Sequence, residues 1–322
     1  MSLKKFEIAG VDTPCVDLGL NVDKFPKPNR GEQVKSLSWQ GGGKVSSGMV
    51  AAARLGAKCA MLGTVGDDDY GQFCIADFQR HGIDTSGMIV RENSTTSLSV
   101  VLSDKETRGR SILGKRGTAK HYAFEELDKS ILEDCEWFFI ANCQEDTVKA
   151  AKVARAAGAK VLIDADGYTP ELMENLDIID AFVASEFVYD ALFQDQNYEA
   201  NCKAIFEKGP SIVVFTFGPR GCVGYSADGY FEMPTFEEVE VVDTVGAGDV
   251  FHGAFLAGLL SGWDAKETSR FASAVSSIKC TRIGGRAGIP NRKTVLDFME
   301  TGKIDYTEID QRVEFYGKKL QV

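Results

Sequence analysis

The sequence predicts an α/β fold in which a doubly wound, mostly parallel sheet is covered by helices on both faces, with a small β-sheet lid beside it. Strand patterns alternate with helical patterns along most of the chain, which is typical of parallel strands joined by helices. Two glycine-rich turns, at 40–48 and 243–249, each open a helix. Alternating segments near 16–22 and 94–114 break this rhythm and predict the small second sheet.

The composition is that of an ordinary globular protein, with 322 residues, of which 44% are hydrophobic and 26% charged. The net charge of −11 argues against binding to a nucleic-acid backbone, although backbone amides and a metal ion can still hold a small phosphate. The eight cysteines form no C-x-x-C pair, so neither a zinc site nor a disulfide framework is expected. No apolar run is long enough for a membrane span or a signal-peptide core, and a cytoplasmic location is expected.

The periodicity of apolar residues and the turn residues between segments give the elements in order. The expected strands lie at 6–10, 16–25, 59–65, 94–103, 110–114, 137–141, 160–164, 181–184, 211–216, 223–225 and 230–233, with a further extended run at 238–242. The expected helices lie at 49–55, 72–81, 124–132, 146–157, 185–193, 199–208 and 265–280, with one that starts at Asp249 and a terminal one after Asn291. Glycines such as Gly56, Gly82 and Gly158 end helices here as C-caps.

The segment from Asp243 to Asp249 carries the clearest chemistry. Gly246 and Gly248 let the backbone turn tightly and let another group come close. The helix that follows begins with unpaired N–H groups, which together with the helix dipole attract an anion. Asp249 adds a carboxylate beside this anion cradle, which indicates a base that acts on a neutral group next to a phosphate. An ordinary helix cap with glycines explains the segment, taken alone, equally well.

Other candidate groups lie where the carboxyl ends of parallel strands are expected, which is where ligands bind in such sheets. They are Asp17, Asp164 and the segment after Thr216. The glycines before the helix at 49–55 indicate either a ligand or close packing of helix on sheet, and the P-loop pattern is absent. A basic cluster along the predicted lid indicates either an anionic substrate or solvated edge charges; it consists of Arg108, Arg110, Lys115 and Arg116.

Four motifs in this order resemble the signatures of the ribokinase-like, or PfkB, carbohydrate kinases. They are Gly42–Gly48 with Ala51–Gly56, Gly66–Gly71, Thr216–Gly221 and Asp243–Gly253. The resemblance covers nearly the whole chain, and the ordered set is far more specific than any one motif. It implies ATP-dependent transfer of a phosphoryl group to a hydroxyl of a sugar.

The resemblance also implies roles for individual residues. Asp249 corresponds to the catalytic base, and the N–H groups of Gly246, Ala247 and Gly248 to the anion hole. Asp17 matches the aspartate that accepts hydrogen bonds from sugar hydroxyls. The other implied substrate-binding residues are Gly42, Gly43, Lys44, Ser47 and Arg110. The implied nucleotide-binding residues are Thr216, Gly218, Gly221, Gly248 and Ser273.

The implied cofactors are ATP and Mg²⁺, and a need for K⁺ is left open. The family motif N-x-x-E is replaced here by Ser185-Glu-Phe-Val188, so Glu186 is the expected Mg²⁺ contact. A loop that binds a monovalent cation in some members aligns with Asp243, Val245, Lys279, Arg282 and Gly284. In it, Lys279 is expected to contribute only its carbonyl.

The resemblance implies a single kinase domain, 1–322, with a lid formed by inserted segments of about 13–40 and 94–118. Closure of the lid would exclude water, and its exposed edges predict a homodimer through the lid. The expected acceptor is ribose, fructose or another keto-sugar, with an anionic sugar left open, and no nucleic acid or membrane is expected as a partner. Two alternatives remain, a nucleoside kinase of the same fold and a non-catalytic ligand-binding relative. The intact Asp249 and the Gly-Ala-Gly turn argue against the second.

Overall fold

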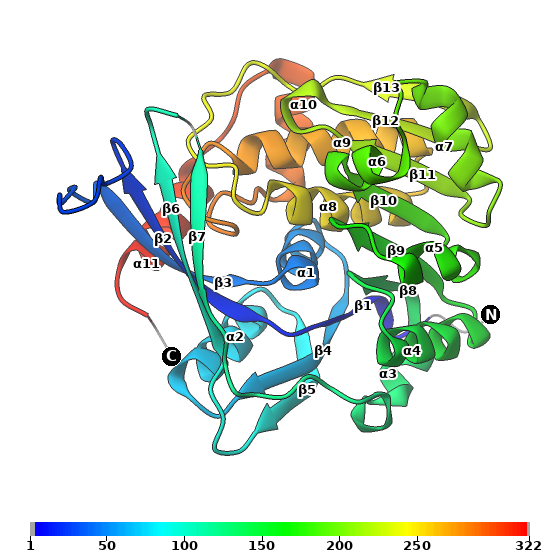
Figure 1. The fold of residues 1–322 in the computed structure, drawn as a ribbon, viewed down its shortest axis with the longest axis horizontal. Coiled ribbons are helices and arrows are strands. Elements are labelled where there is room, and N and C mark those ends of the chain that lie inside the picture. Colours follow the sequence, from blue (N-terminus) through cyan, green and yellow to red (C-terminus); the bar gives the residue numbers. More distant parts are fainter. Residues whose placement is uncertain (1–3, 108, 321–322) are drawn as a thin grey trace.

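The computed structural model describes residues 4–107 and 109–320 (Figure 1). Arg108, one member of the predicted basic cluster, lies outside the described residues. The strands are β1 (Phe6–Asp12), β2 (Cys15–Val22), β3 (Ser36–Gly42), β4 (Cys59–Gly66), β5 (Asp84–Arg91), β6 (Ser97–Asp104), β7 (Arg110–Lys115), β8 (Cys135–Ile140), β9 (Lys160–Ala165), β10 (Ala181–Ser185), β11 (Ile212–Thr216), β12 (Cys222–Ser226) and β13 (Gly229–Met233).

Helices connect and cover these strands. They are α1 (Lys44–Arg54), α2 (Asp69–Arg80), α3 (Lys129–Glu133), α4 (Glu145–Ala156), α5 (Pro170–Glu174), α6 (Glu186–Leu192), α7 (Tyr198–Phe206), α8 (Ala247–Leu260), α9 (Ala265–Lys279), α10 (Arg292–Thr301) and α11 (Thr307–Gly317). Short 3₁₀ turns lie at Phe124–Glu126, Leu176–Ile178 and Gly218–Arg220.

In the described part of the chain, nine strands form one sheet in the order β13-β12-β11-β10-β9-β8-β1-β4-β5. From β11 to β5 the neighbours are parallel, and β12 and β13 add an antiparallel hairpin at one edge. Central strands such as β4 and β8 are buried almost throughout, because helices cover both faces. The prediction of a doubly wound, mostly parallel sheet is therefore confirmed.

Two hydrophobic clusters mark the two faces of this sheet. One cluster packs α1, α8, α9 and α10 on the first face, with side chains such as Val45, Phe255 and Phe271. The other packs α3 to α7 on the second face, with side chains such as Leu132 and Tyr189. Figure 1 shows these two layers on either side of the sheet.

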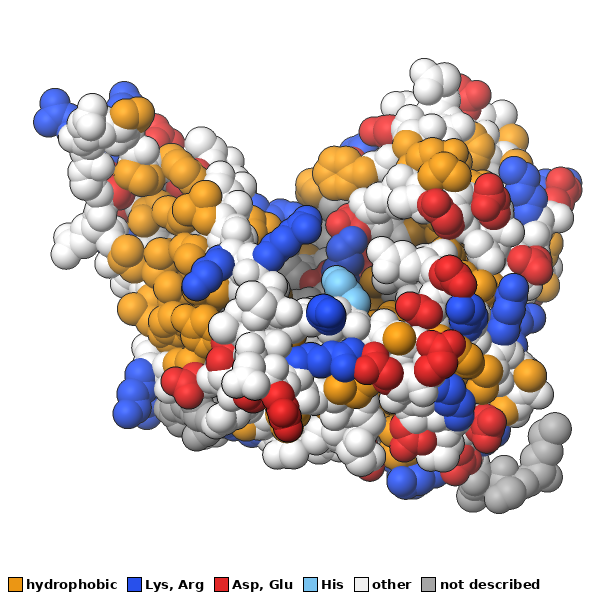
Figure 2. Space-filling model, turned by 60° about the horizontal axis from the view of Figure 1, so that its bottom comes forward, with side chains coloured by type: hydrophobic (Ala, Val, Ile, Leu, Met, Phe, Trp, Pro, Cys, Tyr) orange, Lys and Arg blue, Asp and Glu red, His pale blue; other side chains and the backbone are white. Residues whose placement is uncertain are grey.

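A separate four-stranded sheet in the order β3-β2-β6-β7 projects from the body and forms the predicted lid (Figure 1). Figure 2 shows a hollow between this projecting arm and the body, with Lys and Arg side chains gathered around it. Strand β3 of the lid was not predicted, although Leu37 and Trp39 alternate there with Ser36, Ser38 and Gln40, because the alternation is short and runs into the glycines at 41–43.

Several element predictions are wrong. The helix expected at 124–132 is a 3₁₀ turn followed by the short α3, because Leu127 and Asp128 are extended and Asp128 caps a new helix at Ser130 N. The run at 238–242 forms no strand, and Val241 and Val242 are exposed rather than paired. Helix α1 begins at 44 rather than 49, and β5, α5 and α11 were not predicted.

Candidate active site

Helix α8 begins at the glycine turn that the sequence singled out. Gly246 adopts a left-handed conformation with φ of 71° and is the N-cap of α8. Ala247 donates its N–H to Thr244 O at 3.2 Å, which closes the turn. Gly248 and Asp249 lie in the first helical turn, where N–H groups have no partner within the helix. The N–H of Ala247, which the resemblance assigned to the anion hole, is thus engaged within the turn. The turn leaves the N–H groups of Gly246 and Gly248, with the positive end of the helix dipole, beside the Asp249 carboxylate.

A close helix crossing fixes where Asp249 stands. A Cβ on Gly253 of α8 would lie 1.9 Å from Gly48 O of α1, and a Cβ on Gly48 would lie 2.9 Å from Asp249 O. Both positions therefore need glycine, because a side chain would force the helices apart. The crossing brings the two glycine-rich motifs, which lie about two hundred residues apart in sequence, onto one site.

Asp249 is half-buried, and four charged groups act on it, namely Asp12, Lys44, Asp164 and Asp166. Burial and the nearby Asp164 carboxylate raise the pKa of Asp249 well above its usual range, while Lys44 acts in the opposite direction. Burial disfavours a charge on Lys44, but the carboxylates of Asp164 and Asp166 outweigh it and raise the pKa of this ammonium. Lys44 Nζ lies 3.1 Å from Asp166 Oδ2. Lys44 therefore links the start of α1 to the carboxyl end of β9.

Asp164 is almost fully buried at the carboxyl end of β9. Its Oδ2 makes no hydrogen bond with any described residue, and lies 3.4 Å from His252 Nδ1. His252 is placed by two carbonyls, with Nδ1 2.7 Å from Gly248 O and Nε2 3.1 Å from Val183 O. An unpartnered buried carboxylate oxygen fits a hard cation, since Mg²⁺ takes oxygen ligands from one or two carboxylates together with phosphates and water.

The face of the lid that looks toward the loop at 243–249 is polar. Strand register puts Asp17 opposite Gln40 and Ser99, so that these side chains share one face. Burial raises the pKa of Asp17, and Cys15 Sγ lies 3.5 Å from its Oδ1. A small cavity behind this face is lined by Asp17, Gly19, Ser38, Gln40, Val101, Asp243, Val245, Gly284 and Gly285.

The glycine turn at 41–43 packs directly against charged groups. A Cβ on Gly42 would lie 2.4 Å from Asp17 Oδ2, and one on Gly43 would lie 2.7 Å from Asp12 Oδ2. Asp12 in turn accepts hydrogen bonds from Ser46 N and Oγ, at 2.9 and 2.8 Å, and so anchors the start of α1. The two carboxylates can come this close only because the turn has no side chains.

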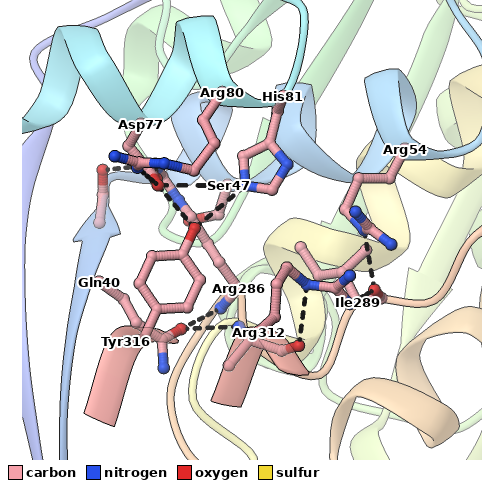
Figure 3. Close-up of polar contacts among 12 residues, drawn as sticks. Gln40, Ser47, Arg54, Asp77, Arg80, His81, Arg286, Ile289, Arg312 and Tyr316 are labelled. Atoms are coloured by element: carbon pink, nitrogen blue, oxygen red, sulfur yellow. Dashed lines mark hydrogen bonds and ion pairs between the residues drawn. The ribbon is translucent and has the colours of Figure 1, made fainter. Parts of the chain in front are cut away.

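A buried ion pair holds this turn from behind, as Figure 3 shows. Arg286 is fully buried, and its guanidinium donates to Asp77 Oδ2 at 2.7 Å, to Gly42 O at 3.0 Å and to Ser47 Oγ at 3.4 Å. Tyr316 donates to the other oxygen of Asp77 at 2.6 Å. The residue predicted as a sugar contact, Ser47, is thus a partner of Arg286 inside the protein.

The predicted nucleotide-binding residues lie at the carboxyl ends of β10 and β11. Thr216 ends β11 beside Ser185, and the 3₁₀ turn Gly218–Arg220 follows. Gly218 has a positive φ of 55° and open space where a side chain would stand, whereas a Cβ on Gly221 would meet Met233 O. Ser273 lies in α9 and is nearly buried. This edge therefore leaves room above Gly218.

Glu186 stands at the first position of α6 and pairs with Arg220 NH2 at 2.6 Å. Both side chains of the pair are substantially exposed, so the ion pair contributes little to the stability of the fold. No cluster of three metal-ligating side chains occurs among the residues that the structure describes. A Mg²⁺ ion here would therefore be held largely by phosphate and water, with single carboxylates completing its coordination.

The predicted monovalent-cation loop is arranged differently from the expectation. Lys279 Nζ donates to Asp243 O at 3.0 Å and to Val245 O, so the expectation that Lys279 contributes only its carbonyl is wrong. Asp243 Oδ2 accepts from Gly284 N at 2.9 Å. Arg282 turns its side chain away to Asp310, at 2.7 Å. Arg110 reaches from the lid to Thr244 Oγ1, at 3.2 Å.

Known proteins similar to this chain identify its family. A model of the pfkB family of carbohydrate kinases matches residues 5–292. The chain belongs to the pfkB family. This confirms the resemblance seen in the four motifs, and with it the interpretation of the chain as an ATP-dependent sugar kinase.

Relatives within the pfkB family match over nearly their full length. A ribokinase from Bacillus subtilis is 30% identical over 91% of this chain and 99% of its own. A 5-dehydro-2-deoxygluconokinase from Shouchella clausii is 27% identical over 92% of this chain and 96% of its own. The crystal structure of a ribokinase from Thermotoga maritima matches with a TM-score of 0.76 and 27% identity, over 92% of this chain and 100% of that one.

Several residues of this site in the pfkB fold were not predicted from the sequence. Asp12 ends strand β1 and Asp166 follows strand β9, positions at the carboxyl edge of the sheet that could have marked them. Gln40 and Arg286 carried no such signal, because their partners lie more than two hundred residues away in sequence. Within the described residues, no helix is long and apolar enough to cross a membrane.

Proposed function

We propose that this sugar kinase uses Asp249 as the base that takes the proton from the acceptor hydroxyl. The supporting observation is that the Asp249 carboxylate stands in the first turn of α8, beside the donors of the Gly246–Gly248 turn. A base there can deprotonate a hydroxyl while the amides stabilise charge on the transferring phosphoryl group. The raised pKa of Asp249 makes it a stronger base than an ordinary aspartate.

The sugar is proposed to lie between the polar face of the lid and α1. Asp17 would accept hydrogen bonds from its hydroxyls, and Gly42, Gly43 and Lys44 would form the wall opposite, with Arg110 at the open side. Nucleotide would bind over Gly218, next to Thr216, Gly221 and Ser273. Mg²⁺, held mainly by the phosphates, would be reached by Asp164 and Glu186 and would neutralise phosphate charge. The lid segments would cover the sugar within one kinase domain.

The acceptor is proposed to be a furanose or keto-sugar, with a keto-sugar acid as the first candidate. The two relatives above are named for ribose and for a dehydro-deoxygluconate. Arg110 at the mouth of the site supplies a cation that a carboxylate could meet. A nucleoside kinase and a non-catalytic relative are less favoured, since the relatives named here are sugar kinases. The cytoplasmic location stays a prediction.

A panel of acceptors tests this assignment. ADP release is measured with MgATP and, in turn, keto-sugars, keto-sugar acids, ribose, fructose and adenosine. The expected result is a kcat/KM for one of the sugars at least about 100-fold above that for adenosine. A different acceptor would leave some buried polar groups of a sugar site without a hydrogen-bond partner, which lowers kcat/KM. Tight binding of sugars without turnover by any of them would contradict the enzymatic role.

The pH dependence of kcat/KM tests the electrostatic setting of Asp249. The base acts when ionised, so activity falls as the pH drops through its pKa. The Lys44 ammonium lowers that pKa, so Lys44→Met is expected to move the acid limb toward higher pH. Lys44→Arg keeps the charge and is expected to leave the limb in place. If the acid limb of Lys44→Met were unchanged, the group that titrates in the pH profile would not be Asp249.

The lid is proposed to pair with the lid of a second copy. Strand register puts apolar side chains on the face of the lid opposite to Asp17; they are Leu18, Leu20, Leu37, Trp39, Leu98, Val100, Leu102 and Leu113. All are at least partly exposed, and Figure 2 shows a broad hydrophobic area on the projecting arm. Trp39 and Leu98 pack against a cluster that includes Phe73 of α2 and Tyr316 of α11. The rest of this apolar face is uncovered, and uncovered apolar faces of this kind mark interaction sites.

Two neighbouring residues of β7 make a matched test of this dimer. Leu113 is 64% exposed on the apolar face, and Ile112 is 56% exposed on the opposite face. Leu113→Glu is expected to give a monomer by light scattering, because a charge would be buried between the lids. Ile112→Glu is expected to stay dimeric. A monomeric unmodified protein at micromolar concentration would refute the lid dimer.

A further inference from the structure

Lys279 ends helix α9, and its side chain is completely buried. Its ammonium reaches the loop that precedes the Gly246–Gly248 turn, where Nζ donates to Asp243 O at 3.0 Å and to Val245 O. A buried ammonium is costly unless polar groups satisfy it. Here backbone carbonyls and the negative end of the α9 dipole do so.

This arrangement does not fit an added monovalent cation. Rings of carbonyl oxygens are the ligands that K⁺ prefers in proteins, and two of the available carbonyls already face an ammonium of the same charge. A second cation at this place would be repelled. The carbonyl of Lys279 itself accepts from Arg282 N at 3.2 Å and belongs to a turn.

The contact between Lys279 and Val245 O affects the orientation of the Gly246–Gly248 anion hole. In a trans peptide the C=O and the next N–H point in opposite directions, so holding Val245 O on Lys279 turns the N–H of Gly246 away from it. The Asp243 carboxylate fixes the same loop, with Oδ1 accepting from Val245 N at 3.0 Å and Oδ2 from Gly284 N at 2.9 Å. The loop thus has a defined conformation with its carbonyls toward Lys279.

The facing loop is fixed as well. Gln40 Oε1 accepts from Arg286 N at 2.6 Å (Figure 3) and from Ala287 N at 2.8 Å. Its Nε2 donates to Ile283 O at 2.9 Å. The loops at 243–245 and 283–287 are therefore both held by side chains of this chain. Their hydrogen bonds do not require a metal ion.

We propose that Lys279 is a built-in monovalent cation, a positioning residue whose ammonium orients the Gly246–Gly248 anion hole and makes the kinase independent of added K⁺. The catalytic part of this inference rests on the function proposed above. The structural part, that the ammonium fills a cation place between carbonyls, is separate and can be measured without turnover.

The unmodified enzyme gives the first test. Its kcat is measured at constant ionic strength in potassium chloride, sodium chloride and choline chloride, with the sugar that the acceptor panel identifies. The three values are expected to agree within about twofold. Activation by K⁺ of about fivefold or more over choline would overturn the proposal, whatever any variant does.

Chemical rescue gives the second test. Lys279→Ala is expected to lower kcat about 10- to 100-fold, with little change in the KM for sugar, because the anion-hole donors lose their alignment. K⁺ or NH₄⁺ is expected to restore at least a tenth of the lost rate, whereas Li⁺ and choline are not. Lys279→Met fills the space without charge and is expected to lose activity without rescue. Full activity of Lys279→Ala in choline would overturn the proposal.

Thermal unfolding supplies a readout besides turnover. K⁺ is expected to raise the Tm of Lys279→Ala by about 2 °C or more over choline, and to leave the unmodified protein unchanged. Lys266, exposed on the same helix, offers the control, and Lys266→Ala is expected to behave as the unmodified protein. If no sugar is turned over, the proposed function fails, yet the Tm comparison still decides whether the Lys279 place takes a cation. A Tm of Lys279→Ala indifferent to K⁺ would overturn it.

Discussion

Replacement of Asp249 by asparagine is expected to lower kcat at least about 100-fold, with binding of sugar and MgATP retained. Asparagine keeps the size and hydrogen-bonding reach of the side chain but cannot accept a proton from the hydroxyl. The backbone turn at Gly246 does not depend on the Asp249 side chain, so the anion cradle should stay in place. Single-turnover phosphoryl transfer, with binding measured by calorimetry, separates the chemical step from affinity.

Asp166 offers the matched control for this substitution. It lies in the same cleft and pairs with Lys44 at 3.1 Å, but that pair is almost half exposed. Asp166→Asn is therefore expected to change kcat by less than about tenfold. A rate for Asp249→Asn within tenfold of the unmodified enzyme, or an equal loss in both variants, would reject Asp249 as the base.

Replacement of Asp77 by asparagine is expected to lower the free energy of unfolding by about 3–5 kcal/mol. Asp77 and Arg286 form a fully buried pair at 2.7 Å, and the substitution leaves the guanidinium without its counter-charge. Burial alone would raise the pKa of Asp77, but Arg286, together with His81 and the Tyr316 hydrogen bond, lowers that pKa. Because Arg286 also holds Gly42 O, the KM for sugar is expected to rise as well. Urea unfolding and steady-state kinetics measure the two effects.

Arg80 supplies the control for the buried pair. It contacts the same carboxylate at 3.2 Å, from a side chain that is 34% exposed. Arg80→Met is expected to cost less than about 1 kcal/mol, because water screens its charge. A loss below 1 kcal/mol in Asp77→Asn as well would show that the buried pair contributes little to stability and positioning.

The fold could be predicted from sequence because its main signals are local. Continuous apolar strands such as β4, helices ended by glycines such as Gly56, and the glycine turn before Asp249 each state their structure within about ten residues. The lid was harder, since β3 is made of serine and glycine around Trp39 and owes its conformation to pairing with β2. Conversely, Val241 and Val242 have strand-like sequence but no strand to pair with.

Site residues could be predicted where they belong to one short sequence motif. They could not be predicted where their role depends on contacts with residues distant in sequence. Asp249 and Gly246 belong to one short segment that can be read directly. Lys279 is separated from Val245 by two helices, and nothing in the sequence around it shows that its ammonium returns to that loop. Arg286 likewise follows two glycines in a loop, a setting that does not reveal its burial against Asp77.

The most direct test of the central claim is a structure of the protein with its sugar, Mg²⁺ and a non-hydrolysable ATP analogue. We expect a carboxylate oxygen of Asp249 within about 3.2 Å of one sugar hydroxyl, with that hydroxyl in line with the γ-phosphate and the N–H groups of Gly246 and Gly248 directed at it. If the acceptor hydroxyl instead lay against Asp17 or Asp164, with Asp249 bound to protein groups alone, the account of this site would be contradicted.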